Sequence, residues 1–134
     1  MPAATDTLLV HLVDDDESVR NSLARLLRAS GIMSQLHGTP EDFLSAAPAD
    51  GMGCILLDLT MPRMSGLEFI KRIQKRGYSM PVVVISARDD DETRRMLRDL
   101  GVKFYLRKPV DEQALIDCIH WVAHDNDTSR SDSA

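Results

Sequence analysis

Short apolar runs alternate with helix-like segments along almost the whole chain, and this alternation most constrains the fold. We expect strands at 8–13, 33–37, 54–57, 81–85 and 102–107. Apolar residues spaced three and four positions apart predict helices at 17–29, 65–75, 91–100 and 111–124, and Thr39-Pro40 is typical of the start of one more short helix. The strands lack polar alternation, which indicates burial on both faces. The pattern therefore predicts an α/β fold, a flavodoxin-like doubly wound five-stranded parallel sheet in the order 2-1-3-4-5 with five helices.

The composition agrees with one soluble globular domain and excludes some partners. Hydrophobic residues make up 43% of the chain and charged residues 28%, which are ordinary values. The net charge is -5. Proteins that bind nucleic acid usually have a cluster of Lys and Arg residues on one surface, so we expect no direct nucleic-acid binding. The first apolar run is too short for a signal peptide or a membrane span. Cys54 and Cys118 lie in apolar runs without metal-binding spacing, which favours reduced thiols and a cytoplasmic protein.

The end of the sequence has a different character from the rest. Residues 125–134 read DNDTSRSDSA and contain no apolar residue except the terminal alanine. We therefore expect residues 1–124 to form one domain, and residues 125–134 to be a flexible tail or the start of a linker.

Polar side chains follow four of the predicted strands at the point where each strand ends. The first strand leads into Asp14 and Asp15, and the others lead into Asp58, Ser86 and Lys108. In a parallel sheet of this type, ligands bind beyond the carboxyl ends of the strands. Three neighbouring carboxylates repel one another unless a cation binds, and all-oxygen ligands suit Mg²⁺, with Mn²⁺ as an alternative. The site therefore predicts a metal-assisted reaction in which Asp58 attacks an electrophilic phosphorus.

Four segments carry a resemblance to a known family. LVDDDESVR, LLDLTMPRMSG, VVISA and GVKFYLRKPV are similar to the receiver domains of two-component response regulators, in the expected order, over about residues 7–124. The first helix and the segment SGLEFIKRI are most similar to receivers that precede helix-turn-helix output domains in the nitrogen-fixation and nitrate-response group.

The resemblance implies a role for each residue of the site. Asp58 would be the phosphoacceptor and a metal ligand, Asp15 a direct metal ligand, and Asp14 a ligand acting largely through bound water. The backbone carbonyl of Thr60 would complete the metal ligands that the protein supplies.

It also implies how the phosphoryl group is held and how the signal is passed on. Ser86 and Lys108 would each bind a phosphoryl oxygen, and Tyr105 would be the aromatic residue that turns inward when Ser86 moves. The peptide bond before Pro109 is commonly cis in the family. Phosphorylation would change the surface formed by the helix 91–100, the strand 102–107 and the helix 111–124.

The resemblance also implies partners and leaves the output open. We expect a sensor histidine kinase or a phosphotransfer protein as phosphodonor. Independently of the resemblance, Phe104 and the arginines of the helix 91–100 suggest the hypothesis of a homodimer through this helix and the strand 102–107. Output is expected to be transcriptional, through a domain outside this chain; the alternative is a stand-alone regulator or phosphorelay shuttle.

The protein would catalyse only its own phosphorylation and dephosphorylation. A magnesium-dependent aspartyl-phosphate hydrolase is a minor alternative, disfavoured because Thr60 stands where such enzymes need a second aspartate.

Two residues depart from the family pattern. Phe104, where a small or polar residue is usual, is expected to pack against the helix 91–100 or to add an apolar patch there. Arg88, two positions after Ser86, is expected to shield the aspartyl phosphate from water and so to change its lifetime. The arginines of the helix 91–100 (Arg94, Arg95 and Arg98) are read either as a solvated face or as a partner surface.

Overall fold

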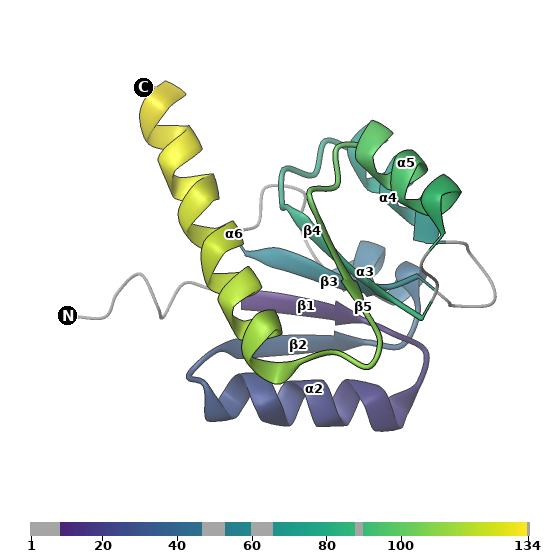
Figure 1. Cartoon of the computed structure of the whole chain (residues 1–134), viewed down its shortest axis with the longest axis vertical. Helices are drawn as coiled ribbons and strands as arrows, with labels where there is room; N and C mark the ends of the chain where they lie inside the picture. The colour runs from purple at the N-terminus through teal and green to yellow at the C-terminus, as the bar shows by residue number, and fades with distance from the viewer. Residues whose placement is uncertain (1–8, 47–52, 60–65, 88–89, 134) are drawn as a thin grey trace.

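The computed structural model describes residues 9–46, 53–59, 66–87 and 90–133, with the backbone alone described for 123–133 (Figure 1). The strands are β1 (Leu9–Val13), β2 (Met33–His37), β3 (Cys54–Asp58), β4 (Val82–Ser86) and β5 (Phe104–Arg107). The helices are α2 (Glu17–Ala29), α3 (Pro40–Ala46), α4 (Gly66–Lys75), α5 (Asp91–Asp99) and α6 (Glu112–Ser133). Strand and helix alternate in chain order, as the sequence predicts.

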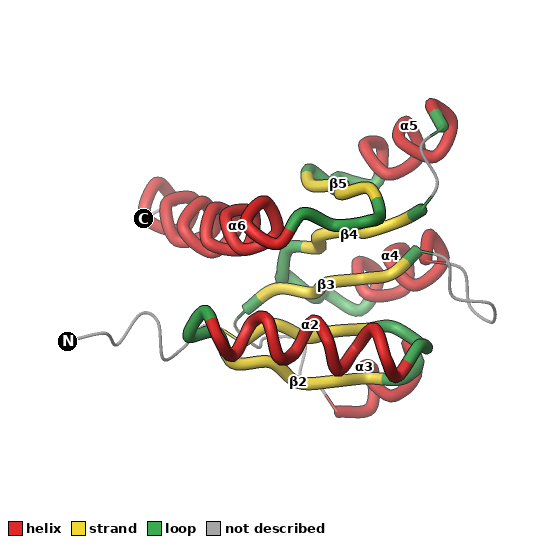
Figure 2. Tube along the Cα trace, turned by 60° about the horizontal axis from the view of Figure 1, so that its bottom comes forward, coloured by secondary structure: helices red, strands yellow, loops and turns green. Residues whose placement is uncertain are grey.

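The strands form one parallel sheet in the order β2-β1-β3-β4-β5, which confirms the predicted topology (Figure 2). The chain moves outward from β1 to β2, then returns past β1 to β3 and continues in the other direction. The strand order therefore reverses beside β1, between β1 and β3. Ligands of doubly wound sheets bind at this point, beyond the carboxyl ends of the strands.

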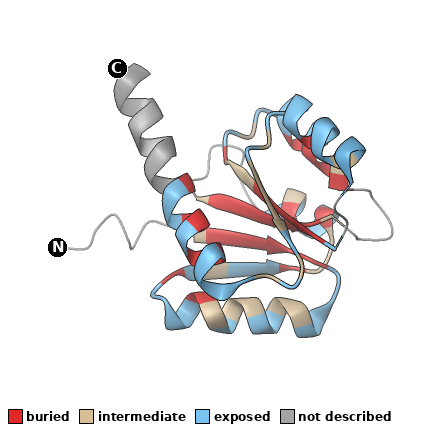
Figure 3. Ribbon diagram, viewed as in Figure 1, coloured by how far each residue is buried: buried red, intermediate tan, exposed pale blue. Residues whose placement is uncertain are grey.

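The core has two parts, one on each face of the sheet. On one face, Leu27 of α2 and Leu115 and Ile119 of α6 are buried against the strands. On the other face, Phe43 of α3 and Phe69 of α4 are fully buried, and α5 and the inward residues of the strands complete the cluster. The middle strands are buried along most of their length (Figure 3). Burial on both faces is why these strands carry apolar residues without polar alternation.

Local capping fixes the start of α2 and the end of α5. The side chain of Asp16 accepts hydrogen bonds from the backbone N–H groups of Ser18 and Val19, so Asp16 is the predicted N-cap. Gly101 has a φ of 88°, and the N–H of Val102 donates to the carbonyl of Leu97. This hydrogen bond closes the last turn of α5, and β5 therefore begins at 104 rather than at the predicted 102.

The last helix is longer than the sequence predicts. The expected end was residue 124, but α6 continues to Ser133 and projects beyond the body of the domain (Figure 1). No Gly or Pro occurs between Glu112 and Ser133, so nothing in the backbone chemistry interrupts the helix. The flexibility of the tail and its use as a linker stay predictions.

Phe104 faces the opposite side of the sheet from the one predicted. It packs with the cluster under α2 and α6, whereas its neighbour Tyr105 packs with the cluster under α5. Successive side chains of a strand point to opposite faces, so Phe104 and Tyr105 cannot both face α5. The expectation that Phe104 packs against this helix or adds an apolar patch beside it was therefore wrong.

In the described part of the chain, no helix is both long enough and apolar enough to cross a bilayer.

Candidate functional site

Four strand ends bring the predicted side chains to one edge of the sheet. Asp14 follows β1, Asp58 ends β3, Ser86 ends β4, and Lys108 follows β5. The strand register fixes their positions along the strand direction. Asp58 is paired with Ile85, which directly precedes Ser86. Asp14 and Asp58 are only 2% and 3% exposed, and Ser86 is fully buried. Polar side chains are seldom buried to this extent unless they are paired or bind a ligand.

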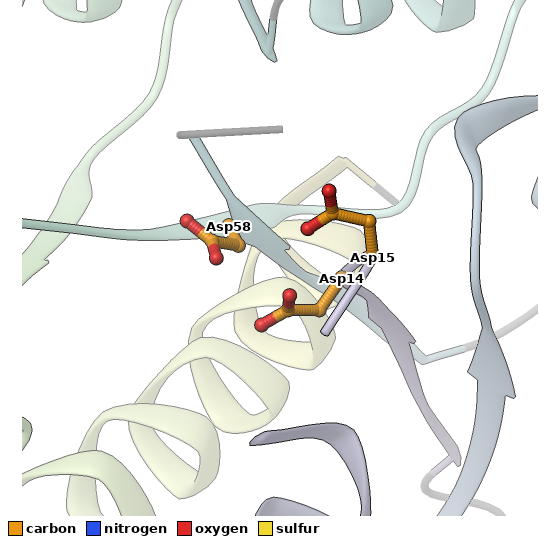
Figure 4. Close-up of side chains that lie close together, drawn as sticks. All are labelled: Asp14, Asp15 and Asp58. Carbon is orange, nitrogen blue, oxygen red and sulfur yellow. The ribbon is translucent and has the colours of Figure 1, made fainter. Parts of the chain in front are cut away.

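Asp14, Asp15 and Asp58 form a cluster of carboxylates. One oxygen from each lies within 4.8 Å of the others, and Figure 4 shows the three side chains gathered at the ends of β1 and β3. Asp14 and Asp58 are buried, whereas Asp15 is exposed. All three ligands are hard oxygen donors, the kind that Mg²⁺ binds through a few carboxylates and several waters.

Lys108 supplies a positive charge to this cluster. Its Nζ lies 2.8 Å from Oδ2 of Asp58, and the side chain is 28% exposed. The backbone N–H of Lys108 donates to the carbonyl of Ser86 at 2.9 Å, which holds the end of β5 against β4. The following Lys108-Pro109 peptide bond is cis, as the resemblance implies. The lysine therefore reaches the carboxylate from an anchored backbone.

One carboxylate oxygen of Asp14 has no hydrogen-bond partner among the described residues. Its Oδ1 accepts from the backbone N–H of Asp16 at 2.9 Å. Its Oδ2 is buried, and no donor in the described part of the chain reaches it. The pKa of Asp14 is raised to about 6, chiefly by burial and to a lesser extent by the negative charge of Asp58, against the opposing effects of the Asp16 N–H and Lys108. A buried oxygen with no donor beside two carboxylates fits a bound cation, because a cation satisfies the oxygen and relieves the repulsion.

Tyr105 lies on the face of the sheet that α5 covers, opposite to Phe104. It is half-buried on β5, and the guanidinium carbon of Arg94 in α5 lies 5.6 Å from the centre of its ring. Both residues line a surface hollow of about 630 Å³ between α5 and β5, with Arg98 and Lys103 at its border. The hollow therefore combines an aromatic ring with several basic side chains.

Two predicted residues lie outside the described part of the chain. They are Thr60, expected to offer its backbone carbonyl to the metal, and Arg88, expected to shield the phosphate. Their roles stay predictions.

Sequence reasoning missed two features beside the site. Arg20 of α2 donates from Nη1 to the backbone carbonyl of Asp14 at 2.6 Å. Its place in the second turn of the helix that follows the acidic run was a usable signal, because that turn lies over the end of β1. The buried side chains of His11 and His37, with Nδ1 and Nε2 3.1 Å apart, had no such signal, since both histidines read as ordinary strand residues.

Comparison with known proteins gives a consistent result. The model of the family described as "Response regulator receiver domain" matches residues 10–120. The transcriptional regulatory protein FixJ of Azorhizobium caulinodans is 39% identical over 114 residues, which is 85% of this chain and 54% of that protein. The transcriptional regulatory protein TdiR of Thauera aromatica is 32% identical over 111 residues, which is 83% of this chain and 49% of that protein.

Solved structures agree with the sequence matches. The crystal structure of FixJ-N superposes with a TM-score of 0.80 at 32% identity, covering 87% of this chain and 94% of that one. The response regulator StyR superposes with a TM-score of 0.86 at 33% identity, covering 95% of this chain and 64% of that one. The chain spans about half the length of the curated relatives it matches.

Proposed function

The chain belongs to the response regulator receiver domain family, and from that premise we propose that Asp58 is its phosphoacceptor. The observation that carries the proposal is the ion pair of 2.8 Å between Lys108 and the buried carboxylate of Asp58, within a cluster of three aspartates. A buried nucleophile beside a fixed cation is suited to attack on a phosphoryl group, because the cation stabilises charge that develops on the phosphoryl oxygens.

Receiver domains bind Mg²⁺ at their acidic pocket, and the oxygen donors of this pocket suit the ion. Asp14, Asp15 and Asp58 would hold Mg²⁺ or Mn²⁺, together with the backbone carbonyl of Thr60, and Asp14 would act largely through water. When bound, the ion supplies positive charge that neutralises the carboxylates and the transferred phosphoryl group. The buried Oδ2 of Asp14, which no donor in the described residues reaches, supports this assignment.

The reaction uses the protein's own side chains in a simple sequence. A carboxylate oxygen of Asp58 attacks the phosphorus of a phosphohistidine, the P–N bond breaks, and an aspartyl phosphate forms. Lys108 and the hydroxyl of Ser86 each bind a phosphoryl oxygen. Water later hydrolyses the acyl phosphate, so the protein catalyses only its own phosphorylation and dephosphorylation. The phosphodonor is a sensor histidine kinase or a phosphotransfer protein, in keeping with the family, whose members interact with such donors.

Phosphorylation would change the surface of α5, β5 and α6. Ser86 would move toward the phosphate and Tyr105 would turn into the space that it leaves. Such a switch needs only a few kcal/mol of differential stability between two states. Arg88 would limit the access of water to the phosphate and so set its lifetime.

The output is proposed to be transcriptional, through a domain outside this chain. Relatives of about twice the length are named transcriptional regulators, which favours this over a stand-alone regulator or a phosphorelay shuttle. The hollow between α5 and β5 supports a dimer through these elements, because its basic side chains and its aromatic ring can meet a second protein surface. Direct nucleic-acid binding by this chain is not expected, and the cytoplasm is its proposed compartment.

The phosphoacceptor proposal is tested by intact-mass spectrometry. Incubation with Mg²⁺ and acetyl phosphate should add a single phosphoryl group to the wild type. Asp58→Asn should show no adduct, and EDTA should abolish the adduct on the wild type. If the folded wild type shows neither an adduct nor a stable complex with beryllofluoride, the phosphoacceptor role is wrong. Continuous release of phosphate over many turnovers from a phosphomonoester would instead favour the hydrolase alternative.

A further inference from the structure

The backbone of Asp14 is held from both sides. Its N–H donates to the carbonyl of His37 at 3.1 Å, and its carbonyl accepts from Nη1 of Arg20 at 2.6 Å. One carboxylate oxygen, Oδ1, is also held by the N–H of Asp16 at 2.9 Å. These contacts fix the main chain and one side-chain oxygen. Oδ2, which no donor in the described residues reaches, is consequently aimed in one direction.

Arg20 reaches this carbonyl from a restricted position. It lies half-buried in α2, and its guanidinium passes over Gly38, where an added Cβ would lie 3.4 Å from Nη1. The carboxylate of Asp42 lies on the same side of Gly38, at 3.8 Å from that Cβ position. The guanidinium is thus confined between the end of β1 and the segment that joins β2 to α3. Its hydrogen bond goes to a neutral carbonyl, so Arg20 does not neutralise an aspartate of the cluster through this contact.

Charge alone would make Arg20 unfavourable for a metal site. A fixed cation near a divalent ion repels it, and removing the cation should strengthen metal binding. A positioning role has the opposite sign, because losing the hydrogen bond to the backbone carbonyl of Asp14 loosens the main chain that orients its carboxylate toward the ion. Groups that orient metal ligands commonly change metal affinity by about 10- to 100-fold when they are removed.

We propose that Arg20 is a positioning residue for the metal site, and that it sets the Mg²⁺ affinity by holding the backbone of Asp14. The inference rests on the proposed function, since it requires that the acidic cluster binds Mg²⁺. Arg20 does not touch the transferred phosphoryl group. Its loss should therefore weaken Mg²⁺ binding without lowering the phosphorylation rate once Mg²⁺ is saturating.

The test compares Mg²⁺ dissociation constants by isothermal titration calorimetry. Arg20→Met should bind Mg²⁺ about 10-fold more weakly than the wild type, or more weakly still. Arg25→Met is the matched control, because it removes the same charge from an exposed position of the same helix. This control should bind Mg²⁺ as tightly as the wild type or slightly more tightly. With acetyl phosphate, Arg20→Met should need more Mg²⁺ for half-maximal phosphorylation but reach a similar maximal rate.

A second variant distinguishes the effect of the hydrogen bond from the effect of the charge. It also keeps the test valid if the first variant does not fold. Arg20→Lys keeps the charge but replaces the planar guanidinium with a single ammonium group. Its affinity should lie between those of the wild type and Arg20→Met, and circular dichroism should show that each variant is folded. If Arg20→Met does not fold, the comparison of Arg20→Lys with the wild type decides. A folded Arg20 variant that binds Mg²⁺ as tightly as the wild type, or more tightly, overturns the inference alone. A wild type that does not bind Mg²⁺ overturns the proposed function as well.

Discussion

At the scale of single residues, the site keeps negative charge where the fold alone would not favour it. Asp14 is buried beside Asp58. Its pKa is raised to about 6, mainly by burial and less by the charge of that neighbour. The folded protein therefore holds the Asp14 proton more tightly than the unfolded chain does. The resulting stabilisation is complete below the ordinary pKa of 3.8 and is lost as the pH rises through about 6. At neutral pH the ionised carboxylate is consequently a cost that the site retains for its chemistry.

Asp14→Asn should therefore stabilise the metal-free protein. The neutral amide removes the buried charge and its repulsion from Asp58, and its oxygen can still accept from the N–H of Asp16. At pH 7 in EDTA we expect the free energy of unfolding to rise by roughly 1–3 kcal/mol, measured by urea denaturation. Asp15→Asn is the control, because Asp15 is exposed and its charge is already solvated. Equal or lower stability of Asp14→Asn would show that Asp14 is not strained in the absence of metal.

Lys108 should increase the rate at which Asp58 is phosphorylated. Lys108→Met removes the cation 2.8 Å from the Asp58 carboxylate, and we expect phosphorylation by acetyl phosphate at saturating Mg²⁺ to slow by about 10²–10³-fold. Lys103→Met removes the same charge from a residue that lines the hollow between α5 and β5, and should leave the initial rate unchanged. Similar rates for the two variants would mean that the ion pair of Lys108 does not contribute to transfer.

The sequence was sufficient to predict which side chains meet, but not how each is held. Asp14, Asp58, Ser86 and Lys108 could be predicted because each stands at the end of an apolar run, and parallel strands end at one edge. The hydrogen bond of Arg20 could be predicted only in part. Its position in the sequence places Arg20 over the end of β1, but the contact itself also depends on the space over Gly38 and on the path of the chain after β2.

At the scale of elements, a cluster of rings joins β1, β2 and α3. The rings of His11 and His37 stack with their centres 5.3 Å apart, and Phe43 meets both edge-on. The pKa of His11 is lowered to about 4, chiefly by burial and to a lesser extent by the neighbouring His37. Burial also lowers the pKa of His37, although Asp42 opposes this effect. Both rings are therefore neutral in the folded protein at neutral pH, one donating and the other accepting in their hydrogen bond.

This cluster should destabilise the fold in mild acid. The pKa of His11 is lower in the folded state than in the unfolded chain, so the unfolded chain takes up the proton first as the pH falls. Its contribution is fully present above about 6.5 and is lost between 6.5 and 4. We expect His11 to contribute a loss of roughly 2–3 kcal/mol across this range, measured by urea denaturation in EDTA as the difference in pH dependence between the wild type and His11→Phe, because the opposite contribution of Asp14 is common to both. His120→Phe is the control, because His120 is exposed on α6. An equal pH dependence of wild type and His11→Phe would contradict the assignment.

The elements themselves were predicted well where local patterns decide them. The strands and helices lie at the expected places, and Asp16 caps α2 as its chemistry suggests. The errors arose where tertiary structure or continuity decides. Side chains alternate between the two faces along β5, so Phe104 faces α6 because its neighbour Tyr105 faces α5. The helix α6 continues beyond its buried residues because no helix-breaking residue follows them. A predicted tail without apolar residues does not by itself define where a helix ends.

At the scale of the whole molecule, the site depends on both halves of the core. β1 and β3 are central strands buried between the two clusters, and they deliver Asp14 and Asp58. Asp58 lies far from Asp14 and Asp15 in the sequence, so the unfolded chain does not bring the three carboxylates together. A cation that needs all three should therefore bind the folded state almost exclusively, and its binding free energy should add to the stability of the entire domain.

Mg²⁺ should accordingly raise the free energy of unfolding in proportion to the logarithm of its concentration. At a free concentration of about 100 times the dissociation constant, the increase should be about 2.7 kcal/mol. Ionic strength is kept constant with NaCl so that screening does not contribute. Asp15→Asn should lose most of this increment while keeping the metal-free stability of the wild type, because Asp15 is an exposed ligand that the core does not need. If Mg²⁺ stabilised wild type and Asp15→Asn equally, the ion would be acting on the general surface rather than on the three carboxylates at the end of β1 and β3.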